Sequence, residues 1–256
     1  MMDDDLFWIW LTLLRGVGPR AQHELLARFK TPCGVYEADM IDLVSVTGIG
    51  ESKARLIAEE RVQARARAVC NRCSELGIDI LTPDKPLFPQ SFCNGSSLPL
   101  VLYARGSVDR PISGVGIVGA RRCSREDRDN AARLASQFVM RGDCVISGMA
   151  KGVDSYAHTA CILADGFTIA VLGCGVDLCY PPEHGLLMQR IIEQGLVISE
   201  YPPATPPVRY HFPKRNRLIA ALCTDLYVVG AQKGSGALIT AQYAVQFGKK
   251  VHYVNA

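Results

Sequence analysis

The sequence predicts an α/β protein in which a Rossmann-like parallel sheet, with helices on both faces, is preceded by a small all-helical domain. Three observations support this class. Residues 1–66 show helical periodicity with two Gly-x-Gly turns, and from residue 99 onward short apolar runs alternate with helical patterns. The chain has 256 residues, of which 48% are hydrophobic, so it can bury a core of this size. We therefore expect a helical domain over 1–66 and the sheet domain over 67–256.

Two similar segments occupy most of the helical domain, "LLRGVGPRAQHELLARF" and "VSVTGIGESKARLIAEE". Each consists of an apolar lead-in, a Gly-x-Gly and a helical pattern, which resembles paired helix-hairpin-helix modules or a SAM-like bundle. All four glycines are expected to form tight turns between helices with positive φ: Gly16, Gly18, Gly48 and Gly50.

These turns have two interpretations. Their backbone N–H groups can contact a DNA phosphate, with Arg20 and Lys53 just after them, or they can only close a helical bundle. Residues 1–64 carry seven lysines and arginines against ten aspartates and glutamates, a net charge of −3. Because phosphate affinity is largely electrostatic, we favour the bundle and expect this domain to add little to DNA affinity.

Two stretches lead from the helical domain to the sheet. Residues 62–77 predict a helix. Residues 82–99 are rich in Pro, Gly and Ser but keep large apolar side chains, which indicates a structured extension rather than disorder.

The sheet is predicted from short β-rich apolar runs bounded by glycines. They cover residues 99–106, 115–120, 144–150, 167–175, 196–201, 225–231 and 250–256. Helical patterns lie between them at 125–142, 183–195 and 236–250, and a buried helix is expected at 217–223. Strands that alternate with helices imply a parallel sheet covered on both faces, although the strand order cannot be read from the sequence.

Four loops should open on the edge formed by the carboxyl ends of the strands, where such sheets bind ligands. They cover residues 120–124, 147–154, 202–216 and 232–236, and they contain glycines, cations, and the hydroxyl groups of Ser147 and Ser235. Glycines allow close backbone approach, hydroxyls donate hydrogen bonds, and cations and helix N-termini attract anions. This edge is therefore predicted to bind phosphates.

The third loop holds more cations than any of the other three. Residues 201–224 hold four cations and no acidic residue. Lys214, Arg215 and Arg217 are expected to add to the positive end of the buried helix, with Asn216 as its N-cap. A solvated basic turn is the alternative, but because four loops agree we favour an anion site.

The phosphate is expected to belong to a polymer. The sequence "GCGVDL" places Leu178 where a dinucleotide fingerprint needs its third glycine, and the chain has no Walker A motif. Tyr201, Tyr210 and Phe212 can stack unpaired bases, which is how single strands are held without sequence reading. Packing of a proline-rich loop explains each aromatic residue equally well.

Other features of the composition favour a cytoplasmic protein without a bound cofactor or metal. The first residues lack the basic region of a secretory signal, and no apolar run reaches the roughly 18 residues that span a membrane. Ten cysteines lie scattered without disulfide-framework spacing, as expected in a reducing compartment. Cys70 and Cys73 form an isolated C-x-x-C, for which metal or redox use is the alternative, but we favour neighbouring helix positions.

Several long blocks resemble the DNA-processing protein A (DprA/Smf) family over most of residues 67–254. They are "GARRCS", "SGMAKGVDSYAHTACILADGFTIAVLGCGVDLCYPPEH", "GLVISEYPP", "FPKRNRLIAAL" and "GSGALITAQYA". The resemblance implies a non-catalytic protein that binds single-stranded DNA, helps to load a RecA-type recombinase onto it, and forms a homodimer through its Rossmann-like domain. It also assigns DNA-pocket roles to Arg121, Ser124, Lys151, Lys214, Arg215 and Arg217, with loops shaped by Gly119, Gly148, Gly152, Gly234 and Gly236.

The chain departs from the family pattern at two places. Gly230 and Ala231 stand where Glu-Ala is usual, and the last run ends "VHYVNA" where Pro-Gly is usual. A rival interpretation is a nucleotide-binding enzyme of the lysine-decarboxylase-like phosphoribohydrolase type, with Asp154 and His158 as an acid/base pair. The Pro-Gly-Gly-x-Gly-Thr loop of those enzymes is missing, and we expect Asp154 to cap a helix instead.

Overall fold

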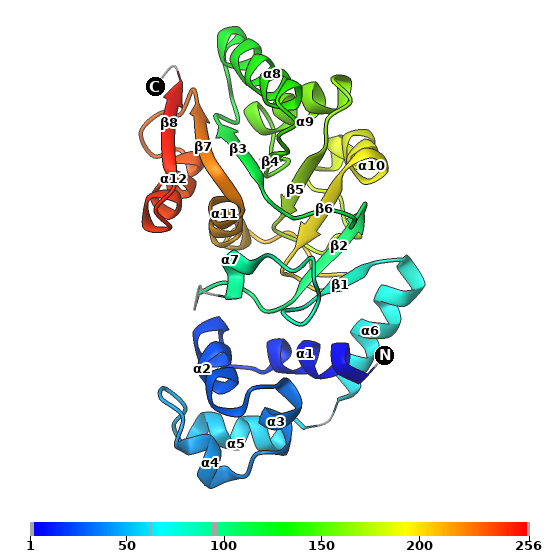
Figure 1. Cartoon of the computed structure of the whole chain (residues 1–256), viewed down its shortest axis with the longest axis vertical. Helices are drawn as coiled ribbons and strands as arrows, with labels where there is room; N and C mark the ends of the chain where they lie inside the picture. Colours follow the sequence, from blue (N-terminus) through cyan, green and yellow to red (C-terminus); the bar gives the residue numbers. More distant parts are fainter. Residues whose placement is uncertain (1–2, 62, 94–96, 255–256) are drawn as a thin grey trace.

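The computed structural model describes residues 3–61, 63–93 and 97–254, which form two bodies stacked along the long axis of the molecule (Figure 1). Short helices form the lower body, which we call the helical unit. An eight-stranded sheet with helices on both faces forms the upper body, which we call the sheet unit. The predicted fold class is confirmed.

The helical unit contains five helices: α1 (Asp3–Leu13), α2 (Pro19–Phe29), α3 (Pro32–Glu37), α4 (Met40–Val44) and α5 (Glu51–Glu59). Gly16 and Gly48 have φ of 70° and 81°, so the first glycine of each pair forms the predicted left-handed turn. The prediction is wrong for Gly18 and Gly50, which are extended N-cap residues of α2 and α5 with φ of −77° and −80°.

Helix α6 (Ala64–Leu76) leads from the helical unit to the sheet, as predicted for residues 62–77, of which residue 62 lies outside the described part. Cys70 and Cys73 lie on this helix, and Cys73 is buried. Because α6 runs across the expected boundary at residues 66 and 67, the division into two domains there stays a prediction. The following extension is structured and contains α7 (Gln90–Cys93); its residues 94–96 lie outside the described part.

The sheet has the strand order β1-β2-β6-β5-β4-β3-β7-β8. Its strands are β1 (Asp79–Leu81), β2 (Leu102–Gly106), β3 (Gly114–Gly119), β4 (Val145–Ser147), β5 (Thr168–Leu172), β6 (Leu196–Ser199), β7 (Cys223–Val229) and β8 (Lys250–Val254). The six strands from β6 to β8 in this order are parallel. β1 and β2 pair antiparallel at one edge, which the sequence did not predict. All strands except β1 match a predicted apolar run. Residues 255 and 256 of the last run lie outside the described part.

Helices cover the sheet on both sides, as predicted (Figure 1). The helices α8 (Arg125–Met140), α9 (Val153–Leu163) and α10 (Gly185–Gln194) lie on one face, and α11 (His211–Leu222) and α12 (Gly236–Gln246) lie on the other. Buried side chains of α8 and α9 pack against β3, β4 and β7, and those of α11 and α12 pack against the opposite face. No helix of the described residues combines the length and apolar character needed to cross a membrane.

Candidate nucleic-acid interface

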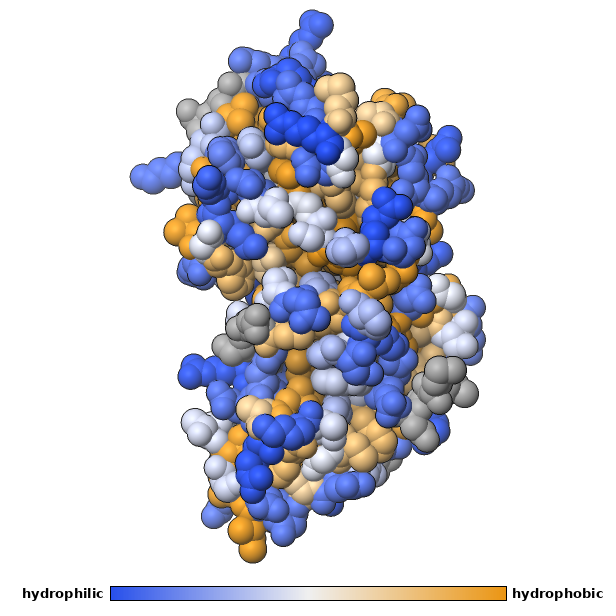
Figure 2. Space-filling view, viewed as in Figure 1, coloured by the Kyte–Doolittle hydropathy of each residue, from blue (hydrophilic) through white to orange (hydrophobic). Residues whose placement is uncertain are grey.

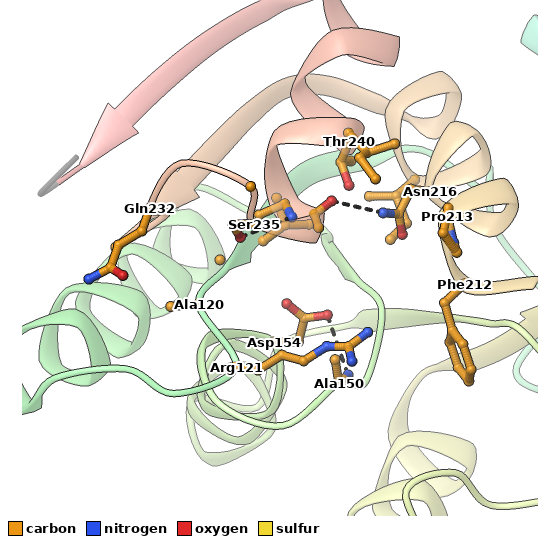
Figure 3. A pocket seen from close by; sticks show the side chains of 18 of the residues that line it. Ala120, Arg121, Ala150, Asp154, Phe212, Pro213, Asn216, Gln232, Ser235 and Thr240 are labelled. Carbon is orange, nitrogen blue, oxygen red and sulfur yellow. Dashed lines mark hydrogen bonds between the residues drawn. The ribbon is translucent and has the colours of Figure 1, made fainter. Parts of the chain in front are cut away.

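A cavity of about 470 Å³ lies at the carboxyl edge of the parallel strands. It is bordered by the loops after β3 and β7, by Ala150 and Asp154 after β4, and by the first turns of α11 and α12 (Figure 3). This is the edge at which the sequence predicts a phosphate site. The arrangement brings backbone segments far apart in the chain around one opening.

The loop after β3 presents two exposed arginines, Arg121 and Arg122, to this cavity. Neither has an ion-pair partner within 4.0 Å in the described part of the chain. The loop then enters α8 through a capping box in which Ser124 and Asp127 bond each other's backbone N–H groups. Ser124 therefore caps the helix and does not line the cavity, and its predicted DNA-binding role stays a prediction.

The loop after β4 is organised by the buried carboxylate of Asp154. Its Oδ2 accepts hydrogen bonds from the backbone N–H groups of Gly148 at 3.2 Å and Ala150 at 3.3 Å. The prediction that Asp154 caps α9 is wrong, because Gly152 occupies the N-cap position. Burial raises the pKa of this carboxyl, and the nearby guanidinium of Arg215 opposes that effect.

Arg215 ties three segments together behind the cavity wall. It is 4% exposed, and its guanidinium donates hydrogen bonds to the carbonyl oxygens of Gly148, at 2.7 Å, and Val171. A Cβ at residue 148 would lie 2.5 Å from this guanidinium, which explains the glycine there. Burial lowers the pKa of Arg215, while the charge of Asp154 favours its protonated form. Arg215 faces the cavity but is bonded internally, which is the alternative that the sequence left open for this member of the trio.

Lys214 and Arg217 share one carboxylate, that of Glu200. Arg217 Nη2 lies 2.7 Å from Glu200 Oε2, and both side chains are 6% exposed. Lys214 Nζ lies 3.5 Å from the same oxygen but is 47% exposed. The predicted trio of solvent-facing cations is thus wrong for Arg217, because its neutralising acid stands one residue before the acid-free stretch. Neither Lys214 nor Arg217 lines the cavity.

Helix α11 begins earlier than predicted, at His211 with Tyr210 as N-cap. The three cations consequently lie inside the helix. Lys214 and Arg217, three residues apart, share one face and one carboxylate, whereas Arg215 points elsewhere, since successive residues are rotated by about 100°. Asn216 is not an N-cap. Its Nδ2 donates a hydrogen bond to the carbonyl oxygen of Gly236 at 3.1 Å and so joins α11 to the start of α12 (Figure 3).

The aromatic residues of this region have unequal surroundings. Tyr201 is buried and stacks on His211 with ring centroids 3.8 Å apart, so the packing interpretation holds for it. Phe212 lines the cavity and packs against Tyr180 at 5.1 Å. Tyr210 is 71% exposed and remains available for base stacking.

The loop after β7 closes the cavity on the side of α12. Gln232 and Lys233 are exposed, and Ser235 is the N-cap of α12, accepting a hydrogen bond from the N–H of Ala237 at 3.3 Å. Gly230, the position where the resemblance leads one to expect glutamate, has φ of 61°. A Cβ there would lie 2.5 Å from the carboxylate of Asp127, so a side chain at this position would be strained and would require Asp127 to move.

A smaller cavity of about 80 Å³ adjoins the first and shares Arg121, Ala150, Phe212 and Arg215 with it. Gly148 and Lys151 also line it. Lys151 forms an ion pair with Glu183, and the hydrogen bond from this lysine lowers the pKa of that carboxyl. We call the two adjoining cavities together the edge cavity.

The structure brings most of the predicted site residues to the edge cavity. Those that line it are Gly119, Arg121, Gly148, Lys151, Arg215, Asn216, Gly234, Ser235 and Gly236. Those that do not are Ser124, Ser147, Gly152, Lys214 and Arg217. Ser147 is buried and donates to the carbonyl oxygen of Ile117 at 2.6 Å, and Gly152 is the N-cap of α9 with φ of 79°. The prediction omitted Arg122, Gln232, Lys233 and Thr240, although the first three belong to the loops it singled out.

The rival acid/base pair does not form a site in the edge cavity. Asp154 lines the cavity, but His158 is fully buried and is not among the lining residues. The Nδ1 atom of His158 lies 2.7 Å from Thr168 Oγ1, which itself donates to the carbonyl oxygen of Val145. Nδ1–H is therefore the donor, and burial lowers the pKa of His158 to about 3.

The chain is similar to proteins that process DNA. The model of the DNA recombination-mediator protein A family matches residues 79–256. The chain is 36% identical over 253 residues to Protein Smf of Synechocystis, covering 97% of this chain and 64% of that protein. It is 38% identical over 154 residues to the DNA processing protein DprA of Streptococcus pneumoniae, covering 60% of this chain and 54% of that protein. The chain thus spans between about half and two thirds of the length of these curated relatives.

Two solved structures share the fold. The structure of DprA from Streptococcus pneumoniae has a TM-score of 0.83 and 27% identity, covering 97% of this chain and 86% of that one. DprA from Helicobacter pylori, whose structure is described for its mode of binding single-stranded DNA, has a TM-score of 0.62 and 28% identity. That match covers 69% of this chain and 80% of the other.

Proposed function

Because this chain belongs to the DNA recombination-mediator protein A family, we propose that it binds single-stranded DNA in the edge cavity and helps to load a RecA-type recombinase onto that strand. It acts by binding, without a cofactor, and as a homodimer in the cytoplasm. Its similarity to DNA processing proteins supports this proposal. So does its similarity to the Helicobacter pylori protein, which binds single-stranded DNA.

One observation carries the proposal. Three exposed cations, Arg121, Arg122 and Lys233, surround the cavity and have no ion-pair partner in the described residues. The glycines of the same loops leave backbone within reach of a ligand, and α12 adds the positive end of its dipole. A volume of about 470 Å³ is in the range of small-molecule sites, so it suits a nucleotide unit of a longer strand.

The enzyme alternative is weaker. His158 bonds to Thr168 and does not line the edge cavity. The proposed acid/base partner of Asp154 is therefore not in that cavity. Release of a free base from a nucleoside monophosphate, lost on changing Asp154→Asn, would support the enzyme instead.

We expect the variant Arg121→Ala/Lys233→Ala to bind single-stranded DNA more weakly and with less salt dependence. Each lost phosphate contact should reduce the slope of log affinity against log salt by about 0.7, so the double variant should lose about 1.4. The measurement is a salt titration with a labelled oligonucleotide. Arg133→Ala/Arg190→Ala is the matched control, because it removes two exposed arginines from outside the cavity. Equal slopes for wild type and the Arg121/Lys233 variant would contradict the assignment of the site.

Recombinase loading requires a second measurement. The wild-type protein should shorten the lag before a RecA-type recombinase forms filaments on single strands coated with single-stranded DNA-binding protein. The Arg121→Ala/Lys233→Ala variant should lose this effect, because it no longer holds the strand. A wild-type protein that binds the strand but leaves the lag unchanged would remove the recombinase from the proposal and leave DNA binding intact. Light scattering of the purified protein gives its molar mass in solution. Twice the mass of one chain would support the homodimer, and the mass of a single chain would contradict it.

A further inference from the structure

A second basic cavity, of about 520 Å³, lies between the helical unit and the sheet unit. We call it the junction cavity. In the space-filling view the outline of the molecule narrows where these two units meet (Figure 2). The lining residues come from the start of α2, the turn before α5, the extension and α11: Gly18, Pro19, Arg20, Ala21, Glu24, Thr47, Gly48, Lys53, Ser97 and Lys214.

Three cations from three separate segments line this cavity against one carboxylate, Glu24. Arg20 is exposed and has no ion-pair partner in the described residues. Lys53 donates a hydrogen bond to the carbonyl oxygen of Gly48 at 2.8 Å and has no ion pair there either. Lys214 shares Glu200 with Arg217, so two cations face one carboxylate and a net positive charge remains.

The backbone adds to this positive field. Gly18, the N-cap of α2, makes no side-chain capping bond, and the first turn of α2 lines the cavity. The N–H groups at such a helix start attract anions. Gly48 from the second copy of the repeated segment lies at the same cavity, so both Gly-x-Gly turns meet there.

The net charge of the helical unit hides this local field, because of the ten acidic residues in 1–64 only Glu24 lines the cavity. Asp42 lies 3.5 Å from Arg28, Glu60 lies 3.8 Å from Arg15, and Asp5 lies 2.8 Å from Lys85. None of these acids lines the junction cavity. The overall charge of −3 is therefore a poor guide to what this face of the unit binds.

The walls of the cavity are joined to one another by several contacts. His23 of α2 lies with its Nε2 3.1 Å from the carbonyl oxygen of Leu98, which joins the helical unit to the extension. The two units also share one buried apolar cluster. Helix α11 borders both cavities, since Arg215 and Asn216 line the edge cavity while Lys214 lines the junction cavity.

We propose that the junction cavity binds the phosphate backbone of the same single strand, beyond the part held in the edge cavity. This inference rests on the proposed function and extends it to the helical unit, against the expectation from net charge. The strand passes over the start of α11, and Arg20, Lys53 and Lys214 contact its phosphates.

The test compares two double variants of the full chain. Arg20→Ala/Lys53→Ala removes cations of the junction cavity, and Arg28→Ala/Arg55→Ala removes the same charge from exposed positions on the same two helices, outside that cavity. With a strand of about 30 nucleotides, the first variant should bind about tenfold more weakly and lose about 1.4 from its salt slope. The control should change binding less than twofold. With a strand of about four nucleotides, near the smallest sites known for single-strand binding, both should bind like wild type.

Three results separate the possibilities. Wild-type protein that binds no single-stranded DNA overturns the proposed function itself. Wild-type protein that binds, with both double variants equal on the long strand, overturns only the junction cavity, as does a loss confined to duplex DNA. If Arg20→Ala/Lys53→Ala lowers the melting temperature, the charge-conserving Arg20→Lys/Lys53→Arg decides: recovery of long-strand affinity supports the proposal, and failure to recover it overturns it.

Discussion

At the scale of single residues, the ion pair between Arg217 and Glu200 shows how a predicted ligand contact becomes a structural one. Both side chains are buried, and Lys214 is the exposed third member. Removing Arg217 leaves the buried carboxylate of Glu200 with only the half-exposed Lys214 as its partner, and breaking a buried pair costs about 3–5 kcal/mol. We expect Arg217→Ala to lower the free energy of unfolding by about that amount and Lys214→Ala by less than about 1 kcal/mol. Urea denaturation measures both.

The double variant Glu200→Ala/Arg217→Ala is the control for this comparison. It removes both charges, so it should be more stable than Arg217→Ala alone. Equal small losses for Arg217→Ala and Lys214→Ala would show instead that Arg217 is solvated.

His158 makes the stability of the protein depend on pH. Burial lowers its pKa from 6.5 to about 3, so the folded chain does not take up this proton in the range where the unfolded chain does. The resulting contribution to stability is complete above pH 6.5 and is lost progressively as the pH falls from 6.5 toward 3. The expected slope reaches about 1.4 kcal/mol per pH unit within this window.

The variant His158→Asn tests this expectation, because its amide can still donate to Thr168 but does not titrate. Free energies of unfolding measured between pH 7 and pH 4 should fall less steeply for the variant than for wild type. His211 also has its pKa lowered by burial, and its contribution remains in both proteins. Parallel pH profiles for the two proteins would show that His158 is not the group responsible.

At the scale of elements, helix α11 marks where prediction from the sequence succeeded and failed. Its apolar half, Leu218 to Leu222, is buried as expected. Its start was placed too late, because no Ser, Thr, Asp or Asn stands before His211 to signal an N-cap. The three cations that were expected to form one phosphate clamp, with Arg215 as its uncertain member, therefore have separate positions: Arg215 is bonded inside the protein, Arg217 is in a buried ion pair, and Lys214 lines the junction cavity.

The antiparallel edge of the sheet is another feature that the sequence could not reveal. β1 has three residues, which is too short for a periodic pattern, and its pairing with β2 spans the whole extension. The loops after β3 and β7 were recognised correctly, since glycines and cations directly follow clear apolar strands there. The sequence could not tell which residues of these loops line the cavity. Lys233 does and Ser124 does not, because Ser124 caps α8, which only the structure shows.

At the scale of the whole molecule, the class of fold follows from hydrophobic periodicity, which records burial residue by residue. The strand order and the junction cavity depend on contacts between distant segments, and periodicity does not record those. Net charge has the same limit, because it adds up side chains without regard to where they lie, so the expectation that the helical unit adds little to DNA affinity stays a prediction.

The buried cluster shared by the two units has a consequence for how this chain can vary. Leu25 and Ile57 of the helical unit belong to the same cluster as Leu100 and Tyr103 beside the sheet. A core that crosses the junction favours unfolding as one cooperative event. A chain cut after residue 64 would expose apolar side chains that make proteins aggregate, so it could not serve to measure DNA affinity. Point mutations can therefore change the surface cations of the helical unit without removing its core, while the unit itself cannot be discarded.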